Sequence, residues 1–144
     1  MRYSLANYIV SITPNDNAMK IFGTISIGGE GSYLDSINLS LANNLYDTSS
    51  YATGAWVHDK NLAKNGTVSI TLNQLSAQVA KFKQMANMLY SSDYEGLTIT
   101  VSDTLGNEVA KAIDCYFVKI PDQDFGQKAS NQQWQLTAGK ISFN

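Results

Sequence analysis

The stretch Gly23–Ile37 reads GTISIGGEGSYLDSI and places closely spaced glycines between two segments in which apolar and polar residues alternate. Alternation with a period of two is typical of β-strands. Glycine is favoured where a turn needs a positive φ angle, so the pattern predicts two antiparallel strands joined by an extended loop. The tip of this predicted hairpin consists of Gly28, Gly29, Glu30, Gly31 and Ser32.

The same glycines also invite comparison with a phosphate-binding loop. Such a motif requires the glycine turn to open directly onto the N-terminus of a helix. Gly29 and Gly31 supply a G-x-G pattern, but Leu34 stands where the third glycine is needed, and Glu30 adds a negative charge. The residues that follow alternate like a strand. The sequence therefore favours glycines chosen for turn conformations over an anion site.

Length and composition limit the possible classes of protein. At 144 residues the chain is long enough for one domain with its own core, which we expect to span residues 1–144. Charged residues make up 15% of the chain, against about 25% in an average soluble domain. The formal net charge of −2 provides no basic footprint for gripping nucleic acid. A polar surface with few charges suits a subunit covered by other subunits, and it equally suits a neutral soluble domain.

The cellular compartment is indicated by the absence of a transmembrane segment and of a secretory signal in this sequence. No apolar run is long enough to span a bilayer, and the N-terminal residues do not have the pattern of a secretory signal. We therefore expect synthesis in a reducing cytoplasm and no association with a membrane. The single cysteine, Cys115, cannot form an internal disulfide, which agrees with that compartment.

Periodic segments along the chain predict further strands and one helix. The helix covers Leu75–Tyr90, where apolar residues recur at helical spacing and Asn73 or Ser76 is positioned to cap the start. The last strand changes face midway, and a β-bulge at Gly139 would restore a common inward face. The predicted strands are Tyr8–Thr13, Lys20–Ile27, Tyr33–Leu41, Thr67–Leu72, Leu97–Ser102, Glu108–Ile120 and the segment from Gln132.

The order of these elements predicts a mainly β fold. We expect an antiparallel β-sandwich or barrel with one flanking α-helix, an extended hairpin and a long loop. In four of the predicted strands the outward positions carry only Ser, Thr or Asn and no charge. Edge strands are normally protected from edge-to-edge pairing by Lys, Pro or inward charge, so unprotected strands favour assembly. The alternative is ordinary solvent exposure of residues with good β-propensity.

The connection Asn43–Gly66 is long and has weak periodicity. Loops above about 15 residues are uncommon in compact domains and are usually functional or disordered. This loop carries more apolar surface than a solvated linker does. We expect an arm that becomes ordered against a neighbouring copy; alternatively, the loop caps its own core or contains a short helix. Its large apolar residues are Leu45, Tyr46, Tyr51, Trp56 and Val57.

The sequence offers no candidate catalytic, cofactor or metal site. A zinc site needs three or four protein ligands, whereas His58 and Cys115 are the only His and Cys. A Cys–His nucleophilic pair needs an accessible thiol, but Cys115 shares its strand parity with Ile113 and Phe117 and is expected to be buried. The Asp-Phe-Gly tripeptide at 124–126 lacks the other kinase motifs and the remaining ligands of a calcium loop. We therefore expect a protein that is not an enzyme.

Two segments resemble a bacteriophage tail tube protein of the contractile-tailed type. They are FGTISIGGEGSYLDSINLSLANNLYD at Phe22–Asp47 and WQLTAGKISFN at Trp134–Asn144, and the size and element order agree over essentially the full length. The resemblance implies a β-sandwich or barrel-like subunit that forms hexameric rings, which stack into a rigid tube inside a contractile sheath. It also implies that sheets of neighbouring subunits join around the lumen, and that a hairpin and a long loop reach into adjacent rings.

The resemblance assigns roles to particular residues. Contacts between subunits would involve Gly28, Gly29, Glu30, Gly31, Tyr33, Leu45, Tyr46, Tyr51 and Trp56. Small polar side chains suit a lumen through which nucleic acid slides, because they provide no cations to hold phosphates. The lumen-lining candidates are Thr24, Ser26, Ser36, Asn38 and Ser40, although Lys20 nearby departs from a cation-free wall.

The implied partners are further copies of the chain, a tail sheath protein and, within the lumen, a tape measure protein and transiting DNA. The implied location is the virion tail, after assembly in the host cytoplasm. Two alternatives stay open. The same architecture serves in the tube of a bacterial contractile injection or type VI secretion system. A monomeric β-sandwich that binds carbohydrate would instead use Tyr46, Tyr51 and Trp56 as a stacking platform.

Overall fold

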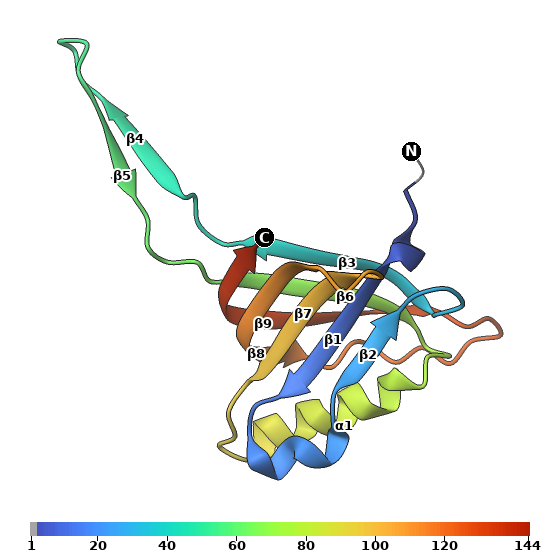
Figure 1. Cartoon of the computed structure of the whole chain (residues 1–144). Helices are drawn as coiled ribbons and strands as arrows, with labels where there is room; N and C mark the ends of the chain where they lie inside the picture. The colour runs from blue at the N-terminus through green and yellow to red at the C-terminus, as the bar shows by residue number, and fades with distance from the viewer. Residues whose placement is uncertain (1–2) are drawn as a thin grey trace.

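The computed structural model describes residues 3–144 and shows a mainly β fold with one α-helix, as the sequence predicts (Figure 1). Seven strands form one antiparallel sheet in the order β2-β1-β7-β8-β9-β6-β3, and β4 and β5 form a separate two-stranded sheet. The strands of the large sheet are β1 (Tyr8–Pro14), β2 (Ile25–Gly28), β3 (Leu34–Leu41), β6 (Gly66–Asn73), β7 (Leu97–Asp103), β8 (Glu108–Lys119) and β9 (Asn131–Phe143). The other elements are β4 (Tyr46–Ser50), β5 (Trp56–Lys60), the helix α1 (Gln78–Ser91) and two 3₁₀ helices, η1 (Leu5–Asn7) and η2 (Asn17–Phe22).

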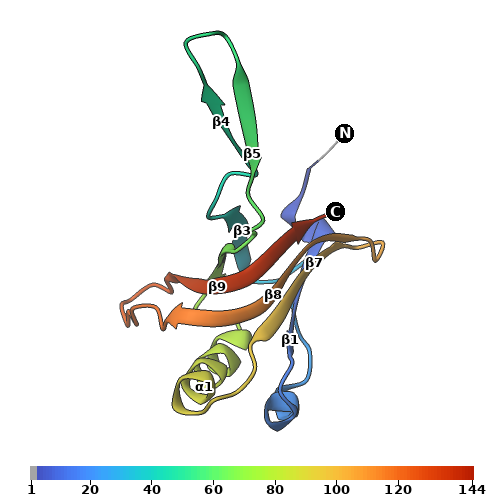
Figure 2. The ribbon, with the colours of Figure 1, turned by 90° about the vertical axis from the view of Figure 1, so that its left-hand side faces the viewer.

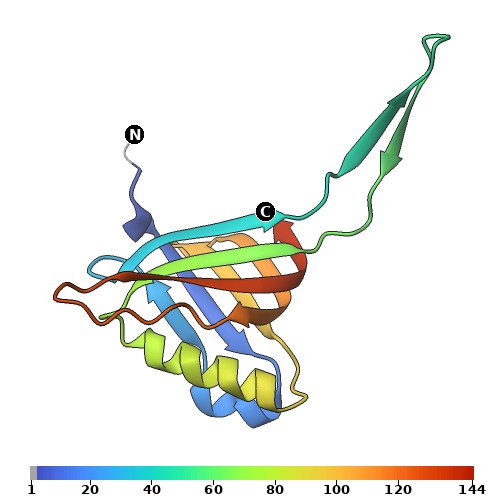
Figure 3. The same ribbon diagram turned by 180° about the vertical axis from the view of Figure 1, so that it is seen from behind.

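The large sheet is strongly curled, so that it forms two layers around one core (Figures 1 and 3). We call β2, β1, β7 and the N-terminal part of β8 the β2-side layer. We call β3, β6, the N-terminal part of β9 and the C-terminal part of β8 (Tyr116–Lys119) the β3-side layer. The long strands β8 and β9 pass from one layer to the other, and α1 closes the open end between the layers (Figure 2).

The core forms where the alternating strands of both layers face each other. In β6, Val68, Ile70 and Leu72 are fully buried, and β7 buries its apolar residues with the same alternation. The ring of Trp134 on β9 packs edge-on against Phe82 of α1, with ring centroids 5.4 Å apart. Such aromatic contacts add to the stabilisation from buried apolar area, and they attach the helix to the sheet.

The strands predicted from alternation at Tyr8–Thr13, Thr67–Leu72 and Leu97–Ser102 are confirmed within one residue. The helix is also confirmed, but it begins at Gln78 rather than at Leu75. Leu75, the first apolar residue of the predicted helix, precedes α1 and is 62% exposed, so it does not belong to the buried face of the helix. Asn73 and Ser76 accept hydrogen bonds from the backbone N–H groups of Leu75 and Gln78 in the turns before the helix.

The predicted hairpin across the glycine loop is wrong. Ile25–Gly28 pairs with β1, and Leu34–Leu41 pairs with β6, so the two segments occupy opposite edges of the large sheet. The loop between them crosses from one layer to the other. Both strands alternate as expected, but alternation determines the strand and its buried face, and it does not determine the partner.

The predicted strand Lys20–Ile27 is correct only in its second half. The first half belongs to the 3₁₀ helix η2, in which Asp16 caps the start by accepting a hydrogen bond of 2.9 Å from the Ala18 N–H. Alternation within Lys20–Ile27 would place Ile21 on the buried face with Ile25 and Ile27, but Ile21 is 81% exposed. A capped turn after Asn15–Asp16 therefore prevails over the alternation of the following residues.

The change of face in the last strand occurs as expected, but the bulge lies in a different strand. β8 and β9 keep one register across Ala112↔Ile141 and Cys115↔Ala138, which places Asp114 opposite Gly139. The register shift lies between β7 and β8, where Asp114 has a φ angle of +56°. A bulge bends its strand and increases the local twist, and this one allows the sheet to curl between its two layers.

Candidate assembly surfaces

The long connection between β3 and β6 forms an arm, residues 43–65, that extends away from the rest of the fold (Figures 1 and 3). Its strands β4 and β5 pair only with each other, from Tyr46↔Lys60 to Ser50↔Trp56. Every residue of both strands is exposed. The arm therefore neither caps its own core nor contains a helix, which removes both alternatives considered for it.

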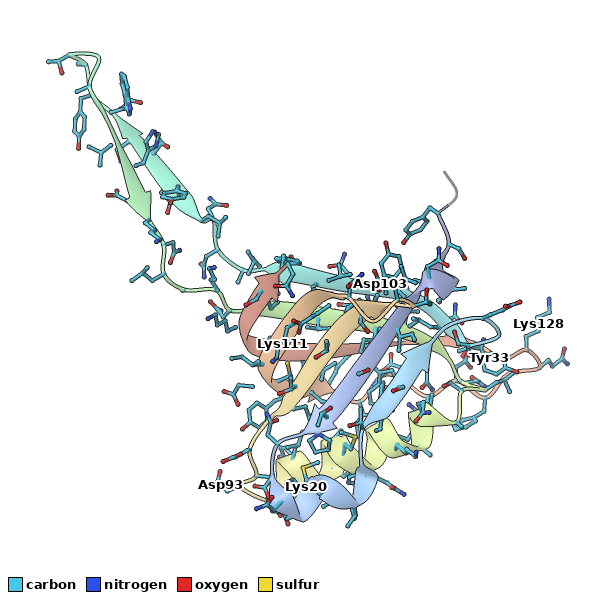
Figure 4. The ribbon with its side chains drawn as sticks, in the orientation of Figure 1. Lys20, Tyr33, Asp93, Asp103, Lys111 and Lys128 are labelled. Carbon is cyan, nitrogen blue, oxygen red and sulfur yellow. The ribbon has the colours of Figure 1, made fainter. Side chains whose placement is uncertain are left out.

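The arm carries large apolar side chains along its length, and they are exposed in the single subunit. Figure 4 shows side chains projecting from the arm away from the body. Its four predicted contact residues are more than half exposed: Leu45 (51%), Tyr46 (57%), Tyr51 (58%) and Trp56 (66%). A turn around Gly54 closes the hairpin, and the Thr48 hydroxyl lies 2.8 Å from Nδ1 of His58 across the strands. Isolated two-stranded hairpins are marginally stable in water, and large exposed apolar surfaces mark interaction sites.

The glycine loop connects β2 to β3, which are the two edge strands of the large sheet. Gly28, Gly29 and Gly31 all have positive φ angles, which explains the choice of glycine at each position. A Cβ atom at Gly28 would collide with the backbone carbonyl oxygen of Tyr8, whereas Gly29 and Gly31 face open space. Glu30 is exposed and Tyr33 is 52% exposed. These residues are accessible, but they sit close to the sheet and do not form the extended tip that the sequence suggested.

The five predicted lumen-lining residues are all exposed, but they belong to two different layers. Thr24 and Ser26 lie at β2, where Ser26 pairs with Ser11, and Ser11 pairs with Thr100. Ser36, Asn38 and Ser40 lie on the outer face of β3. Lys20 lies in η2 at the end of the molecule opposite the arm, while Lys111 belongs to the β2-side layer (Figure 4).

The outer face of the β3-side layer is polar and nearly free of charge. Residues directly opposite one another across β3, β6 and β9 form three rows. Two rows continue onto β8, through Tyr116 and Lys119, and Lys119 is the one charged residue that the described chain places on these rows. The rows are Ser36–Thr71–Gln133, Asn38–Ser69–Gln135 and Ser40–Thr67–Thr137.

The β3-side layer has two strand edges without a neighbour among the described residues. One is β3 itself, which pairs only with β6. The other is the C-terminal part of β8, because β7 accompanies β8 only as far as the pair Leu97↔Cys115. This second edge was not predicted from the sequence. The apolar outward residues Val118 and Ile120, which are 56% and 38% exposed, are the signal that could have revealed it.

A groove of about 300 Å³ runs beside the free edge of β8. Its floor is partly apolar, and Tyr90 at its rim is 94% exposed. The groove lies between the C-terminal half of α1 and the end of β8. Its lining residues are Ala86, Asn87, Tyr90, Phe117, Val118, Lys119 and Ile120.

Cys115 and His58, the two residues considered for a nucleophilic pair, lie in different parts of the structure. Cys115 is fully buried, and burial together with the charge of Asp114 raises the pKa of its thiol to about 12. His58 lies on the exposed hairpin of the arm, so it does not pair with Cys115. The Asp-Phe-Gly tripeptide lies in the exposed loop between β8 and β9. Residues 3–144 contain no group of three or more His, Cys, Asp or Glu that could hold a metal ion.

No helix within the described residues is both long enough and apolar enough to cross a membrane.

Comparison with solved structures finds the same fold in contractile injection systems. A chain from the PVC sheath/tube terminator of an extracellular contractile injection system is 12% identical with a TM-score of 0.58, covering 100% of this chain and 97% of that chain. A chain from the PVC sheath-tube complex is 12% identical with a TM-score of 0.57, covering 99% and 91%. A chain from the anti-feeding prophage cap is 12% identical with a TM-score of 0.54, covering 100% and 93%. At such low identity these likenesses establish the fold.

The comparison with protein families is more specific. A sequence search of curated proteins finds no match. A family model described as bacteriophage PhiTE tail tube protein matches residues 2–144, which is nearly the whole chain. The resemblance seen in the sequence is therefore confirmed, and the fold agrees with it. The chain belongs to the bacteriophage PhiTE tail tube protein family and is a structural subunit of a phage tail tube.

Proposed function

We propose that this tube subunit forms hexameric rings that stack into a hollow conduit, through which DNA passes into the host. The observation that carries this proposal is the arm, a strand pair whose every residue is exposed. A single subunit offers it no core to pack on. Other copies of the same chain supply the missing apolar contacts, because in a stacked tube each arm reaches the adjacent ring.

The direction of the arm supports stacking. The arm continues from the end of β3 and returns to the start of β6, and it points away from α1 (Figure 3). It therefore prolongs the strands of the β3-side layer beyond the body of the subunit. If these strands run along the tube, the arm spans the boundary between one ring and the next. We assign Leu45, Tyr46, Tyr51 and Trp56 to this contact.

The distribution of charge on the two layers supports an assignment of the layer that faces the lumen. Ser36, Asn38 and Ser40 belong to a face whose three rows carry one charge, Lys119 at the end of β8. The face that contains Thr24 and Ser26 is not equivalent, because Lys111 and Thr100 are directly opposite each other on its neighbouring strands. Cations in the wall would hold DNA phosphates. We therefore propose that the β3-side layer faces the lumen, and that Thr24 and Ser26 face outward.

Further roles follow from placing the subunit in a contractile tail. The tube would sit inside a sheath formed by a tail sheath protein, and one of the similar solved chains comes from a PVC sheath-tube complex. A tape measure protein and then DNA would occupy the lumen, without specific binding. The tube would be assembled in the host cytoplasm and would remain in the virion tail. None of these roles requires catalysis or a cofactor.

Electron microscopy of the purified protein tests the proposal. At high concentration the protein should form rings or stacked tubes. A variant in which residues 45–60 are replaced by a short Gly-Ser linker should keep the body fold, seen by circular dichroism, and should fail to stack. A wild-type protein that stays monomeric at millimolar concentration would reject the proposal. If that monomer binds glycans through Trp56, the carbohydrate-binding alternative would replace it.

A further inference from the structure

We propose that Leu105 of one copy enters a groove beside η2 of a copy in the adjacent ring, and that this contact joins the bodies of stacked subunits in addition to the arm. The inference rests on the proposed stack of rings and names a second contact within it. We call the groove, which has a volume of about 270 Å³, the η2 groove. It is lined by Thr13, Pro14, Lys20, Gly23 and Thr24.

The first support is the unusual position of Leu105. It lies at the tip of the turn between β7 and β8 and is 86% exposed. Turn positions favour Gly, Pro, Asn, Asp and Ser, because these residues adopt turn geometry easily or bond to the turn backbone. Here Gly106, with a φ angle of +89°, provides the unusual backbone conformation, so the leucine side chain has no role in forming the turn. Its apolar surface is available for a contact outside the subunit.

The second support is that the turn holds Leu105 in a fixed position. The Asp103 carboxylate accepts hydrogen bonds of 3.0 and 2.9 Å from the backbone N–H groups of Leu105 and Asn107. The Asn107 side-chain amide donates to the same carboxylate over 3.3 Å. The Thr104 N–H donates to the Asn7 carbonyl of η1 over 3.0 Å, which attaches the turn to the body. A preorganised turn has little conformational entropy to lose when its tip binds another surface.

The third support is the chemistry of the η2 groove. The Thr13 and Thr24 hydroxyls lie 3.3 Å apart and are hydrogen-bonded to each other, so an apolar occupant leaves neither without a partner. Pro14 and Gly23 add no polar side chain. Lys20 is exposed, and its methylene stem can cover an apolar occupant while its ammonium group stays in water. The groove therefore suits one apolar side chain.

The 3₁₀ helix η2, which forms part of the groove, is firmly attached to the body. Met19 is fully buried, and the Asp16 carboxylate caps the helix by accepting a hydrogen bond of 2.9 Å from the Ala18 N–H. The same carboxylate accepts a hydrogen bond of 3.2 Å from the Glu95 N–H, which joins η2 to the connection between α1 and β7. Ile21, also in η2, is 81% exposed and adds apolar surface at this end of the body.

The turn and the groove lie at opposite ends of the same pair of strands. Tyr8 at the start of β1 lies opposite Asp103, which precedes the turn, whereas Pro14 at the end of β1 lines the groove. Seven residues of extended strand span about 20 Å, so Leu105 cannot reach the groove of its own subunit. Figure 4 shows Asp103 on the side of the body from which the arm projects and Lys20 at the opposite end.

This placement fits a second copy in the adjacent ring. Successive rings of a stack are related by a rotation about the tube axis and a shift along it. Each contact between rings is therefore head-to-tail, and one end of a subunit meets the opposite end of another. The ring that receives the arm thus also brings its η2 grooves toward Leu105. Because the turn and the groove are different surfaces, the contact repeats along the stack without closing on itself.

Truncation of Leu105 tests the contact. Leu105→Ala should raise the protein concentration needed for stacked tubes about tenfold, measured by sedimentation, because an apolar contact is lost at every junction between rings. Electron microscopy should still show single rings, and urea denaturation should be unchanged, because the side chain is exposed. Thr104→Ala, a truncation of the neighbouring exposed residue, is the matched control and should leave stacking unchanged. Equal stacking of Leu105→Ala and the wild type would overturn the contact.

A charge cycle tests the choice of groove. Leu105→Lys places an ammonium group beside Lys20 and should impair stacking more than Leu105→Ala does. Combination with Lys20→Glu should recover much of the loss. Combination with Lys81→Glu, an equal change of charge on an exposed residue of α1, should not. A Leu105→Lys, Lys20→Glu double variant without recovery would overturn the assignment of Leu105 to the η2 groove.

Cross-linking provides an independent readout. Leu105→Cys combined with Thr24→Cys should give, with a short bismaleimide, a ladder of linked subunits on a denaturing gel once tubes have formed. Neither single variant should give a ladder, because the buried Cys115 does not react. Tubes of the double variant without a ladder would reject this contact and leave the proposed stack intact. A wild-type protein that forms no tubes would reject both the contact and the proposed function.

Discussion

The strand pairs β3–β6 and β4–β5 lie end to end in the same hairpin and have opposite environments. The β3–β6 pair buries one face, with Val68, Ile70 and Leu72 fully inaccessible. The β4–β5 pair has the same antiparallel ladder and buries none of its residues. Because hydrogen bonds alone contribute little net stability, the first pair is held by its core. In the proposed tube, the second pair would gain its buried surface from other copies of the chain.

This comparison explains how one chain can be both a stable subunit and an assembly unit. Burying a large apolar side chain contributes about 1.5–3 kcal/mol. The body uses that free energy to fold, whereas in the proposed assembly the arm would gain it on contact with other copies. The first two of the following experiments make matched changes, one in the body and one in the arm.

The largest effect on folding is expected for Trp134→Ala in the body. Trp134 is fully buried against Phe82 and Phe117, with ring centroids 5.4 and 5.6 Å apart. Its truncation should lower the free energy of unfolding by about 3–5 kcal/mol, measured by urea denaturation of the dilute protein. Trp134→Phe is the control, because it keeps a ring and removes an indole N–H that has no partner within the described chain. A loss below about 1 kcal/mol for Trp134→Ala would show that this contact does not organise the core.

The matched change in the arm is Trp56→Ala. Trp56 is 66% exposed, so the free energy of unfolding of the dilute protein should change by less than about 0.5 kcal/mol. The concentration required for tube formation should rise about tenfold, because the lost contact is made only with another ring. Sedimentation across a concentration series measures this shift. A destabilised monomer, or unchanged assembly, would mean that Trp56 packs within its own subunit.

Thiol labelling compares the two regions without disturbing either. Cys115 is buried, and its raised pKa of about 12 leaves little reactive thiolate at neutral pH. Thr53→Cys places a thiol in the exposed turn of the arm. In the dilute protein the arm thiol should react with a maleimide while Cys115 does not. After assembly the arm thiol should become protected. Labelling of the arm at the same rate in both states would contradict a role in assembly.

The smallest effect is a dependence of stability on pH above 9. Burial, followed by the charge of Asp114, raises the pKa of Cys115 from 9.0 to about 12 in the folded subunit. Below pH 9 the thiol is protonated in both states and contributes nothing. Above it, the unfolded chain loses the proton first, so the free energy of unfolding falls as pH rises from 9 to about 12. Cys115→Ala should show a shallower decline, and identical pH profiles for the two proteins would refute the assigned burial.

The sequence allowed the strands and their buried faces to be predicted where alternation was uninterrupted. Thr67–Leu72 and Leu97–Ser102 have a strict period of two, and both are strands with the expected residues in the core. The exposure of the arm could also be predicted in part. Its aromatic residues occur without the periodicity that would place them on one face of a helix or strand of the body.

The choice of strand partner could not be predicted. The glycine-rich loop between Ile25–Gly28 and β3 favours a hairpin locally, yet the two strands occupy opposite edges of the sheet. Partner choice depends on the shape of the whole curled sheet, which one segment does not encode. For the same reason the free edge of β8 was not predicted. It exists because β7 begins at Leu97, opposite Cys115, and does not extend alongside the C-terminal part of β8.

The position of the bulge illustrates a related limit. Gly139 lies on β9 directly opposite the bulged residue Asp114, so the bulge was predicted at the correct position along the sheet but in the wrong strand. The glycine leaves room for Asp114, because a Cβ atom at position 139 would lie 3.3 Å from the Asp114 Cβ. The extra residue itself is in β8, at a non-glycine position with φ of +56°. Asp is among the residues that tolerate this conformation, but the sequence gives no separate signal for it.

Amide hydrogen exchange at low and high protein concentration tests the comparison most directly. In the dilute subunit, β3 and β6 should be protected, and the amides of β4 and β5 should exchange almost freely. In the assembled protein, β4 and β5 should become protected together with the outer edge of β3. If β4 and β5 are as well protected in the dilute subunit as in the assembly, the arm is stable without neighbours and the account fails.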